Sequence, residues 1–393
     1  MCVMSNQRPA STPEFKHTLD SKKITMAIDI NGMCDACKFN ETKKQIDWKE
    51  REEKLLILLD KYRKNDGSFD CIVPGSGGKD SVYASHVLKY KYGMNPLTVT
   101  WPPIMYTDYG RENFNNWLSN GGFDNISYRP NGRVQKLLTK YSIMNLLHPF
   151  QTFILGQKNI AAKMAIKFGI DLVFYGENEA EYGNPVADNS SSLRDKSYHS
   201  FKNIEEIYLG GVSIKELLEK NDWIKLSDLS SFMPTPESDL IKQNIEVHYL
   251  GYYLKWIPQE VYYYAVKNTG FKARPFRTQG TYSKYNSIDD KIDDLHYWTT
   301  FIKFGLGRAS YDASQEIRNN HITREEGVAL VEKFDGEFPD RYFSEIMNYL
   351  EIREEDFFKR IDEGRSPHLW GKDNSGNWKL RHKVSAKGLD DAP

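Results

Sequence analysis

The sequence is poor in cysteine, in long apolar runs and in net charge. Its 393 residues include four cysteines, all at or before position 71, so later segments carry no thiol. The 53 basic and 54 acidic residues leave a formal charge of -1, which excludes a surface that grips nucleic acid through overall positive charge. The longest aliphatic run, residues 55–59, is far short of the roughly 20 residues that span a bilayer.

The lack of a secretory signal and the small number of thiols indicate the cellular compartment. No basic start followed by an apolar stretch marks a secretory signal. Few thiols without an even framework of spacings favour a reducing compartment. We therefore expect a cytoplasmic protein with no membrane span and no nucleic acid partner.

The patterns along the chain predict three regions. Residues 1–45 are polar and irregular and are expected to form a small zinc-knuckle-like appendage, and residues 276–393 are mostly helical in pattern. In residues 46–275, short apolar runs alternate with helical segments, which predicts an α/β domain whose parallel sheet is covered on both faces. The polar stretch at 186–200 is typical of an exposed loop, with a lid as the alternative. The chain after Gly371 is expected to be loosely held.

The elements are predicted from apolar periodicity. Strands are expected at 69–73, 97–101, 125–128 and 171–175. Helices are expected at 48–62, 79–92, 111–119, 134–141, 151–168, 289–304, 310–319, 323–334, 339–350 and 354–363. Because ligands of such sheets bind at the carboxyl ends of the strands, functional residues are expected in the loops that follow them.

The strongest functional signal is the run Pro74, Gly75, Ser76, Gly77, Gly78, Lys79, Asp80 and Ser81, between a predicted strand and a predicted helix. Glycines let backbone N–H groups approach an anion, and the helix N-terminus adds its positive dipole end. The two serines supply hydroxyl donors, the lysine supplies a positive charge, and the aspartate can hold Mg²⁺ against phosphates. All eight residues are therefore candidates for binding a polyphosphate.

This loop has neither the GxxxxGK[ST] nor the GxGxxG spacing. Its core, Ser-Gly-Gly-Lys-Asp-Ser, resembles the PP-loop of the ATP pyrophosphatase superfamily. The resemblance implies ATP and Mg²⁺ as cofactors and cleavage of ATP to AMP and pyrophosphate to activate a carbonyl or carboxyl oxygen. It also implies a catalytic role for Lys79 and Asp80 and places the adenine at Thr100 and Trp101, where the second strand ends.

Members of this superfamily attach either nitrogen or sulfur to the activated carbon. The one thiol close to the loop, Cys71, lies inside an apolar run, where burial makes a thiol inert. Nitrogen transfer is therefore favoured, with tRNA sulfur transfer and a nucleotide-binding scaffold of a glutaminase complex as the alternatives. Only about 70 residues precede the loop, too few for a glutaminase domain of typical size. Ammonia is thus expected from solution or from a partner.

The remaining cysteines suggest a metal site. Cys34 and Cys37 have the C-x-x-C spacing that lets two thiolates bind one ion, and Cys2 would be a third ligand. A structural Zn²⁺ site needs four ligands, and His17 is a candidate for the fourth. An incomplete site, a redox pair or isolated thiols are the alternatives.

Further segments agree with one family, namely residues 2–4, 32–37, 76–81, 131–133, 148–151, 156–158, 174–183, 208–212, 279–282 and 303–308. Through them the chain resembles, to about residue 350, the bacterial N-acetyl sugar amidotransferases of WbpG and PseA type. That family usually opens with a paired C-x-x-C whose second cysteine corresponds to Cys2, and here the first is absent.

The resemblance implies a reaction in lipopolysaccharide O-antigen or nonulosonic-acid biosynthesis. An acetamido group on a nucleotide-activated or nonulosonic sugar is adenylylated on oxygen, and ammonia then displaces AMP to leave an acetamidino group. The implied ammonia source is a glutaminase paired with a barrel subunit, both resembling those of imidazole glycerol phosphate synthase.

Other candidate residues follow from position and from the shared segments. Acidic residues after the fourth strand can hold Mg²⁺ or take a proton from ammonia, although a solvated acidic loop has the same composition. Arginines and lysines suit phosphate or carboxylate, although ion pairs with the acidic run at 289–294 are an equal alternative. The candidates are Lys158, Glu177 and Glu181 for catalysis, Gly176 for the nucleotide, and Asn131, Arg133, Gln157, Asn178, Glu179, Arg274, Gln279, Lys303 and Arg308 for the substrate.

Overall fold

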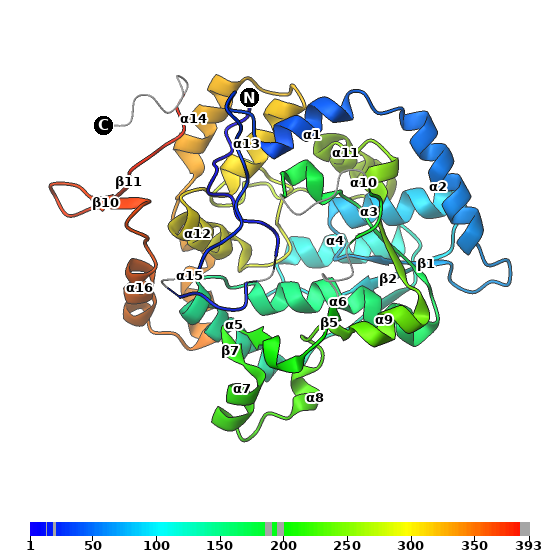
Figure 1. Cartoon of the computed structure of the whole chain (residues 1–393), viewed down its shortest axis with the longest axis horizontal. Helices are drawn as coiled ribbons and strands as arrows, with labels where there is room; N and C mark the ends of the chain where they lie inside the picture. The colour runs from blue at the N-terminus through cyan, green and yellow to red at the C-terminus, as the bar shows by residue number, and fades with distance from the viewer. Residues whose placement is uncertain (13, 19–20, 185–190, 195–199, 386–393) are drawn as a thin grey trace.

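The computed structural model describes residues 1–12, 14–18, 21–184, 191–194 and 200–385. Its centre is a five-stranded sheet in the order β3-β2-β1-β4-β9, and every neighbouring pair is parallel (Figure 1). The strands are β1 (Cys71–Pro74), β2 (Pro96–Thr100), β3 (Asn125–Ser127), β4 (Leu172–Tyr175) and β9 (Glu246–Tyr249). The predicted α/β fold class is confirmed, and so are the four predicted strands to within two residues at each end.

The fifth strand, β9, was not predicted. It reads Glu-Val-His-Tyr, and its polar first and third residues hide the apolar pattern of a buried strand. Its backbone nevertheless pairs along the whole length of β4. Tertiary pairing therefore overrides a weak local signal.

Helices cover both faces of the sheet because successive strand residues point to opposite sides. On one face Ile72 packs with residues of α5 (Gly132–Leu146), α6 (Gln151–Phe168) and α9 (Glu237–Gln243). On the other face Cys71 and Val73 pack with residues of α2 (Trp48–Tyr62), the helix from α3 (Lys79–His86) into the π-helical η1 (Val87–Lys91), and α10 (Leu250–Tyr253). Both faces are thus buried, as a parallel sheet requires.

Shorter elements connect these layers. They are α1 (Asp35–Lys43), α4 (Asp108–Ser119), η2 (Glu179–Tyr182), β5 (Ser200–Phe201), η4 (Ile204–Glu206), β6 (Tyr208–Leu209), β7 (Val212–Ser213), α7 (Ile214–Lys220), α8 (Leu226–Leu229), β8 (Thr235–Pro236) and α11 (Pro258–Thr269). Most of the predicted loop at 186–200 lies outside the described residues. Within the described ranges, no helix is both long enough and apolar enough to cross a bilayer.

The C-terminal region is helical, as predicted. It contains α12 (Asp293–Phe304), α13 (Arg308–Arg318), α14 (Arg324–Phe334), α15 (Asp340–Leu350) and α16 (Glu354–Glu363). Beyond them, β10 (Trp370–Lys372) and β11 (Trp378–Leu380) pair antiparallel. Trp370 is 5% exposed, and its indole N–H donates to the carbonyl of Ile302 at 2.7 Å. Trp378 and Leu380 of β11 also pack against the core of the C-terminal region, so the expectation of a loosely held chain after Gly371 is wrong as far as residue 380.

The first 45 residues do not project from the molecule as a separate appendage. Cys2, Met4 and Met26 share a buried cluster with Leu306 of the C-terminal region. In Figure 1 this segment, in dark blue, runs beside α12 towards α5 and α6. It therefore lies between the two larger regions.

Candidate functional site

The phosphate loop has a shape that only glycine permits at two positions. A Cβ on Gly75 would lie 2.1 Å from the Cβ of Ser81, and a Cβ on Gly77 would lie 2.7 Å from the Cα of Phe114. Gly77 also has a φ of 86°, which L side chains rarely adopt. Gly78 is the N-cap of α3, so the bare backbone of the loop leads directly to the positive end of that helix.

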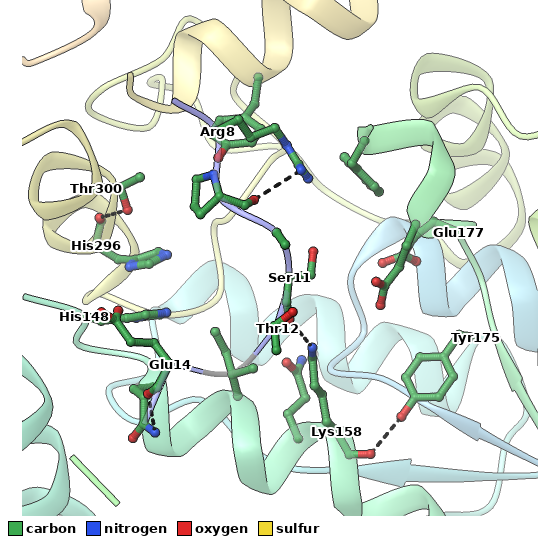
Figure 2. A pocket seen from close by; sticks show the side chains of 18 of the residues that line it. Arg8, Ser11, Thr12, Glu14, His148, Lys158, Tyr175, Glu177, His296 and Thr300 are labelled. Carbon is green, nitrogen blue, oxygen red and sulfur yellow. Dashed lines mark hydrogen bonds between the residues drawn. The ribbon is translucent and has the colours of Figure 1, made fainter. Parts of the chain in front are cut away.

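A cavity of about 900 Å³ opens beside this loop. It is bounded by the carboxyl ends of β1, β2 and β4, by α6 and α12, and by the N-terminal segment (Figure 2). The structure brings these predicted residues to its wall: Pro74, Gly75, Ser76, Gly78, Asp80, Ser81, Trp101, Gln157, Lys158, Gly176, Glu177, Glu179 and Lys303. Residues separated by more than 200 positions thus line one space.

Two carboxylates line this cavity: Asp80 in the first turn of α3, after β1, and Glu177 just after the neighbouring strand β4. Burial and the charge of Asp80 raise the pKa of Glu177 to about 7. One carboxylate oxygen of Asp80 accepts a hydrogen bond from Lys79 Nζ at 2.6 Å, and its other oxygen is buried with no hydrogen-bond partner. A Cβ on Gly176 would lie 2.9 Å from the carbonyl oxygen of Asp80, so only a glycine allows this approach. An orphaned oxygen beside a second carboxylate suits a divalent cation such as Mg²⁺.

Lys158 enters the cavity from α6. Its ammonium donates to the carbonyl of Ser11 at 2.9 Å, and burial, with the nearby charge of Arg194, lowers its pKa to about 8. The hydroxyl of Tyr175 donates to the Lys158 carbonyl at 3.2 Å (Figure 2). Glu179 pairs with Arg194. These contacts place a positive charge on the same wall as the two carboxylates.

Trp101 lines the cavity just beyond β2. It is 2% exposed and packs edge-on against Phe232 and stacked on Tyr128. A Cβ on Gly156 would lie 2.2 Å from the Trp101 ring, so α6 approaches the indole through a glycine. Thr100 differs, because its carbonyl accepts from Tyr128 N and it does not line the cavity.

Several other predicted residues lie outside the cavity wall. Lys79 is buried beside Asp80, with its ammonium 5.6 Å from the centre of the Trp256 ring. Glu181 pairs with Lys43 at 2.5 Å. The other residues outside the wall are Gly77, Thr100, Asn131, Arg133, Asn178, Arg274, Gln279 and Arg308.

Those residues have structural partners instead. Asn131 caps α5 by accepting from Arg133 N at 3.1 Å, and Arg133 lies over the Trp223 ring. Arg308 pairs with Asp312 at 2.8 Å. The remaining contacts join Asn178 to Ala180 N, Gln279 to Asp340, and Arg274 to Thr278. For Arg308, the alternative of an ion pair in place of a ligand contact is therefore correct, although its partner is Asp312 and not a residue of the acidic run at 289–294.

The prediction missed the N-terminal segment. Residues 8–12, 14–16 and 21–24 line the cavity. Glu14 accepts a hydrogen bond from Lys303 and forms an ion pair with Lys23, each at 2.6 Å. It also missed His148 and His296. The N-terminal segment was missed because an irregular peptide has no periodicity that indicates which surface it packs on. His148 belongs to the segment 148–151 shared with the family, and that resemblance could have identified it as a candidate site residue.

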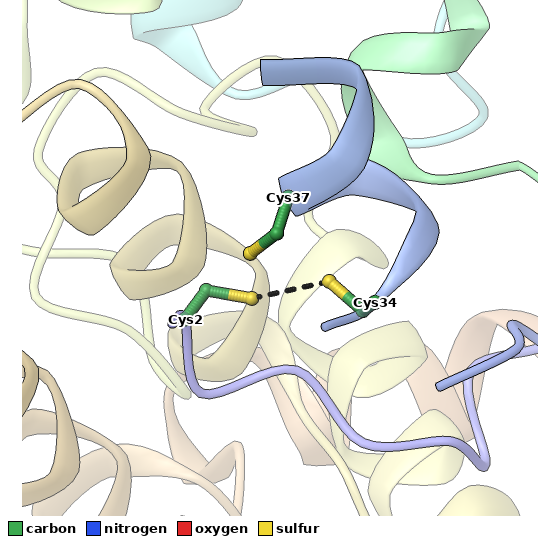
Figure 3. A group of neighbouring side chains, drawn as sticks. All are labelled: Cys2, Cys34 and Cys37. Carbon is green, nitrogen blue, oxygen red and sulfur yellow. Dashed lines mark hydrogen bonds between the residues drawn. The ribbon is translucent and has the colours of Figure 1, made fainter. Parts of the chain in front are cut away.

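The three N-terminal cysteines come together as predicted (Figure 3). Their sulfur atoms lie within 4.8 Å of one another, and Cys2 and Cys34 are 3.4 Å apart. Hydrogen bonds from Cys34 and Cys37 lower the pKa of Cys2, which favours a thiolate. His17 is not a fourth ligand, because its Nδ1 lies 3.2 Å from Glu14. The buried trio fits three of the four ligands of a structural zinc ion.

Comparisons with known proteins support the C-terminal assignment. Residues 279–385 match the family model of the "LPS biosynthesis protein WbpG-like, C-terminal domain". An uncharacterized protein of Methanocaldococcus jannaschii is 35% identical over 85 residues, which are 21% of this chain and 29% of that protein. The chain thus spans less than a third of the length of this curated relative.

Two solved structures are also similar. An NH3-dependent NAD synthetase from Campylobacter jejuni, in complex with nitrate, has a TM-score of 0.28 at 16% identity, covering 51% of this chain and 95% of that one. An NMN synthetase from Francisella tularensis has a TM-score of 0.29 at 13% identity, covering 70% and 94%. Similarity at this level supports no inference about this chain. The predicted WbpG-like character is confirmed by the family model, for the C-terminal segment.

Proposed function

Since residues 279–385 are a WbpG-like C-terminal domain, we propose that this protein is an ATP-dependent amidotransferase. It converts the N-acetyl group of a sugar into an acetamidino group and releases AMP and pyrophosphate. The substrate is a nucleotide-activated or nonulosonic sugar of bacterial lipopolysaccharide or other surface polysaccharide.

The observation that carries the proposal is the phosphate loop beside two carboxylates. Six residues of the loop, Pro74, Gly75, Ser76, Gly78, Asp80 and Ser81, line the cavity at the positive end of α3, where an anion would be stabilised. Asp80 and Glu177 would hold Mg²⁺ there, and the ion would neutralise phosphate charge when bound. Trp101, on the same wall, would receive the adenine.

The reaction has two steps in this cavity. In the first, the amide oxygen of the sugar attacks the α-phosphorus of ATP, an O–P bond forms, and pyrophosphate leaves. Lys158, which lies on the wall, would stabilise negative charge on the phosphate. In the second, ammonia attacks the activated carbon, AMP leaves with the oxygen, and a C–N bond replaces the C–O bond. The amidine nitrogen loses a proton, which Glu177 would accept in the alternative case that Asp80 alone holds the ion.

The placement of thiols supports nitrogen transfer over tRNA sulfur transfer. Among the described residues, no cysteine lines the cavity. Cys71 is fully buried in β1, and burial raises its pKa, so it is inert. The trio of Cys2, Cys34 and Cys37 lies apart from the cavity wall, which suits a structural role.

Two further parts of the proposal concern partners and metal. Ammonia comes from a partner glutaminase with a barrel subunit, both resembling those of imidazole glycerol phosphate synthase. The three thiols hold one zinc ion, which would tie the chain start to α1. Copurification of the subunits and metal analysis of the purified protein test these two claims separately.

The central test is formation of AMP. Purified protein with ATP, Mg²⁺, ammonium chloride and a panel of N-acetylated nucleotide sugars and nonulosonic acids is expected to release AMP and form an amidino product, detected by mass spectrometry. Asp80→Asn should lower the rate at least 100-fold. Asp108→Asn is the matched control, because Asp108 is an exposed acidic residue in the first turn of α4. An Asp80→Asn variant as active as the control would show that Asp80 has no role in the reaction, and no amidino product across the panel would reject the proposal and leave a nucleotide-binding scaffold as the alternative.

A further inference from the structure

Two histidine rings stack on one side of the cavity. His148 follows α5 in a turn where Leu147 has a φ of 50°, and His296 lies on α12. Their ring centres are 4.8 Å apart with an interplanar angle of 19°, and both residues line the cavity. In Figure 2 the rings lie on one side of the N-terminal segment, and Glu177 and Tyr175 lie on the other.

Both rings are neutral at pH 7. Burial lowers the pKa of His296 to about 4, with smaller contributions from Arg308 and Lys303. Burial, together with His296 and Lys303, lowers the pKa of His148 well below its ordinary value. A neutral imidazole carries one N–H donor and one acceptor nitrogen, so the position of its proton decides what it can bind.

The surroundings select the position of that proton. The Nδ1 atom of each ring is buried and has no hydrogen-bond partner. An N–H buried without an acceptor is costly, so the proton is placed on Nε2. Neither Nε2 atom has a protein partner among the described residues, nor is either buried without one. Two Nε2–H donors are therefore left for a molecule in the cavity.

A buried lysine completes the set; burial lowers the pKa of Lys303 to about 7, and the charge of Glu14 opposes that shift. Lys303 lies seven residues after His296 on α12, two turns along the same helix face. It is 6% exposed and donates to Glu14 and to the carbonyl of Leu146, each at 2.6 Å. Lys23 also lies 2.6 Å from Glu14, so two ammonium groups share one carboxylate. Two N–H donors beside such a cluster suit an acceptor with negative charge and disfavour a cation.

We propose that His148 and His296, together with Lys303, form a binding site for an anionic oxygen group of the sugar substrate. The shared chemistry is an oxyanion, either the carboxylate of a sugar acid or a phosphate of a nucleotide sugar. This proposal depends on the proposed function only for the identity of the ligand as the sugar substrate. It would hold the sugar on the side of the N-terminal segment opposite Glu177.

The test is direct binding to the full chain without ATP or ammonia. Calorimetry uses N-acetylneuraminic acid, which has a carboxylate and no phosphate, and UDP-N-acetylglucosamine, which has a diphosphate and no carboxylate. At least one is expected to bind, and His148→Phe and His296→Phe should weaken it tenfold to about a hundredfold, as for one hydrogen bond to a charged group. Phenylalanine keeps the stacked ring and removes the N–H, and the exposed His368→Phe is the matched control.

ATP affinity reports whether the variants are folded, and it should change less than twofold. The site is rejected if neither probe binds, or if both variants bind as tightly as the control. Histidine-dependent binding without AMP formation on the full panel would instead reject the amidotransferase and keep the site. Histidine ¹⁵N spectra at pH 7 supply a second readout: proton signals from Nε2 alone support the site, and protonated Nδ1 in both rings overturns it.

Discussion

Replacing Gly156 by alanine adds one methyl group where α6 packs against Trp101 of the cavity wall. The new Cβ would lie 2.2 Å from the Trp101 ring, far inside normal contact distance. The ring cannot turn aside easily, because it is 2% exposed and held by Phe232 and Tyr128. Either the helix or the indole must therefore move.

The magnitude follows from two opposing effects. Alanine in a helix interior is favoured over glycine by about 1 kcal/mol. Overpacking a rigid core costs about 1–3 kcal/mol and here involves a ring that cannot relax. We expect Gly156→Ala to lower the free energy of unfolding by up to about 2 kcal/mol and to weaken ATP binding, because the added methyl group displaces Trp101 in the cavity wall.

Urea unfolding followed by circular dichroism measures the first effect, and calorimetry with ATP and Mg²⁺ measures the second. Gly132→Ala is the matched control, since it lies at the start of α5 and its added Cβ would meet nothing within 4 Å. The control should be unchanged or slightly more stable, with normal ATP affinity. If Gly156→Ala behaves like the control in both assays, the close approach of α6 to Trp101 is refuted.

Three further predictions concern the acid pair, the thiols and the C-terminal hairpin. The pKa of Glu177 is raised to about 7, so its contribution to the stability of the metal-free protein is lost as the pH rises through 7, whereas Mg²⁺ binding should tighten from pH 6 to pH 8. Thermal unfolding and Mg²⁺ titration measure the two effects, and a Glu177→Gln variant that keeps the same pH dependence contradicts the prediction. Cys34→Ser should abolish a stoichiometric zinc content measured by mass spectrometry and lower the thermal midpoint; wild-type protein without zinc would show that the trio is not a metal site. Trp370→Ala should lower the free energy of unfolding, measured in urea, by about 3–5 kcal/mol, whereas the control Trp223→Ala, at an exposed indole, should lower it by under about 1 kcal/mol. Equal effects of the two substitutions would argue against the packed hairpin.

The sequence predicted the elements whose signals are local. The phosphate loop was found because glycines, hydroxyls and a carboxylate stand together between an apolar run and a helical pattern, and each needs only its neighbours to be recognised. Three thiols near the chain start were grouped by spacing in the same way. Strand β9 was missed because it pairs with β4, which is distant in sequence. The hairpin of β10 and β11 was missed because Trp370 is held by Ile302, 68 positions upstream.

The sequence by itself thus determined the parallel α/β class, the phosphate loop and the candidate metal ligands, since short-range periodicity and spacing encode them. Only the tertiary structure decided which charged residues share the cavity. Glu14 meets Lys303 across 289 positions and His148 stacks on His296, whereas Glu181 and Arg308 are taken up by Lys43 and Asp312. The physical reason is that a charged side chain in sequence is only a potential ligand, and packing decides whether its partner is another residue or an open cavity.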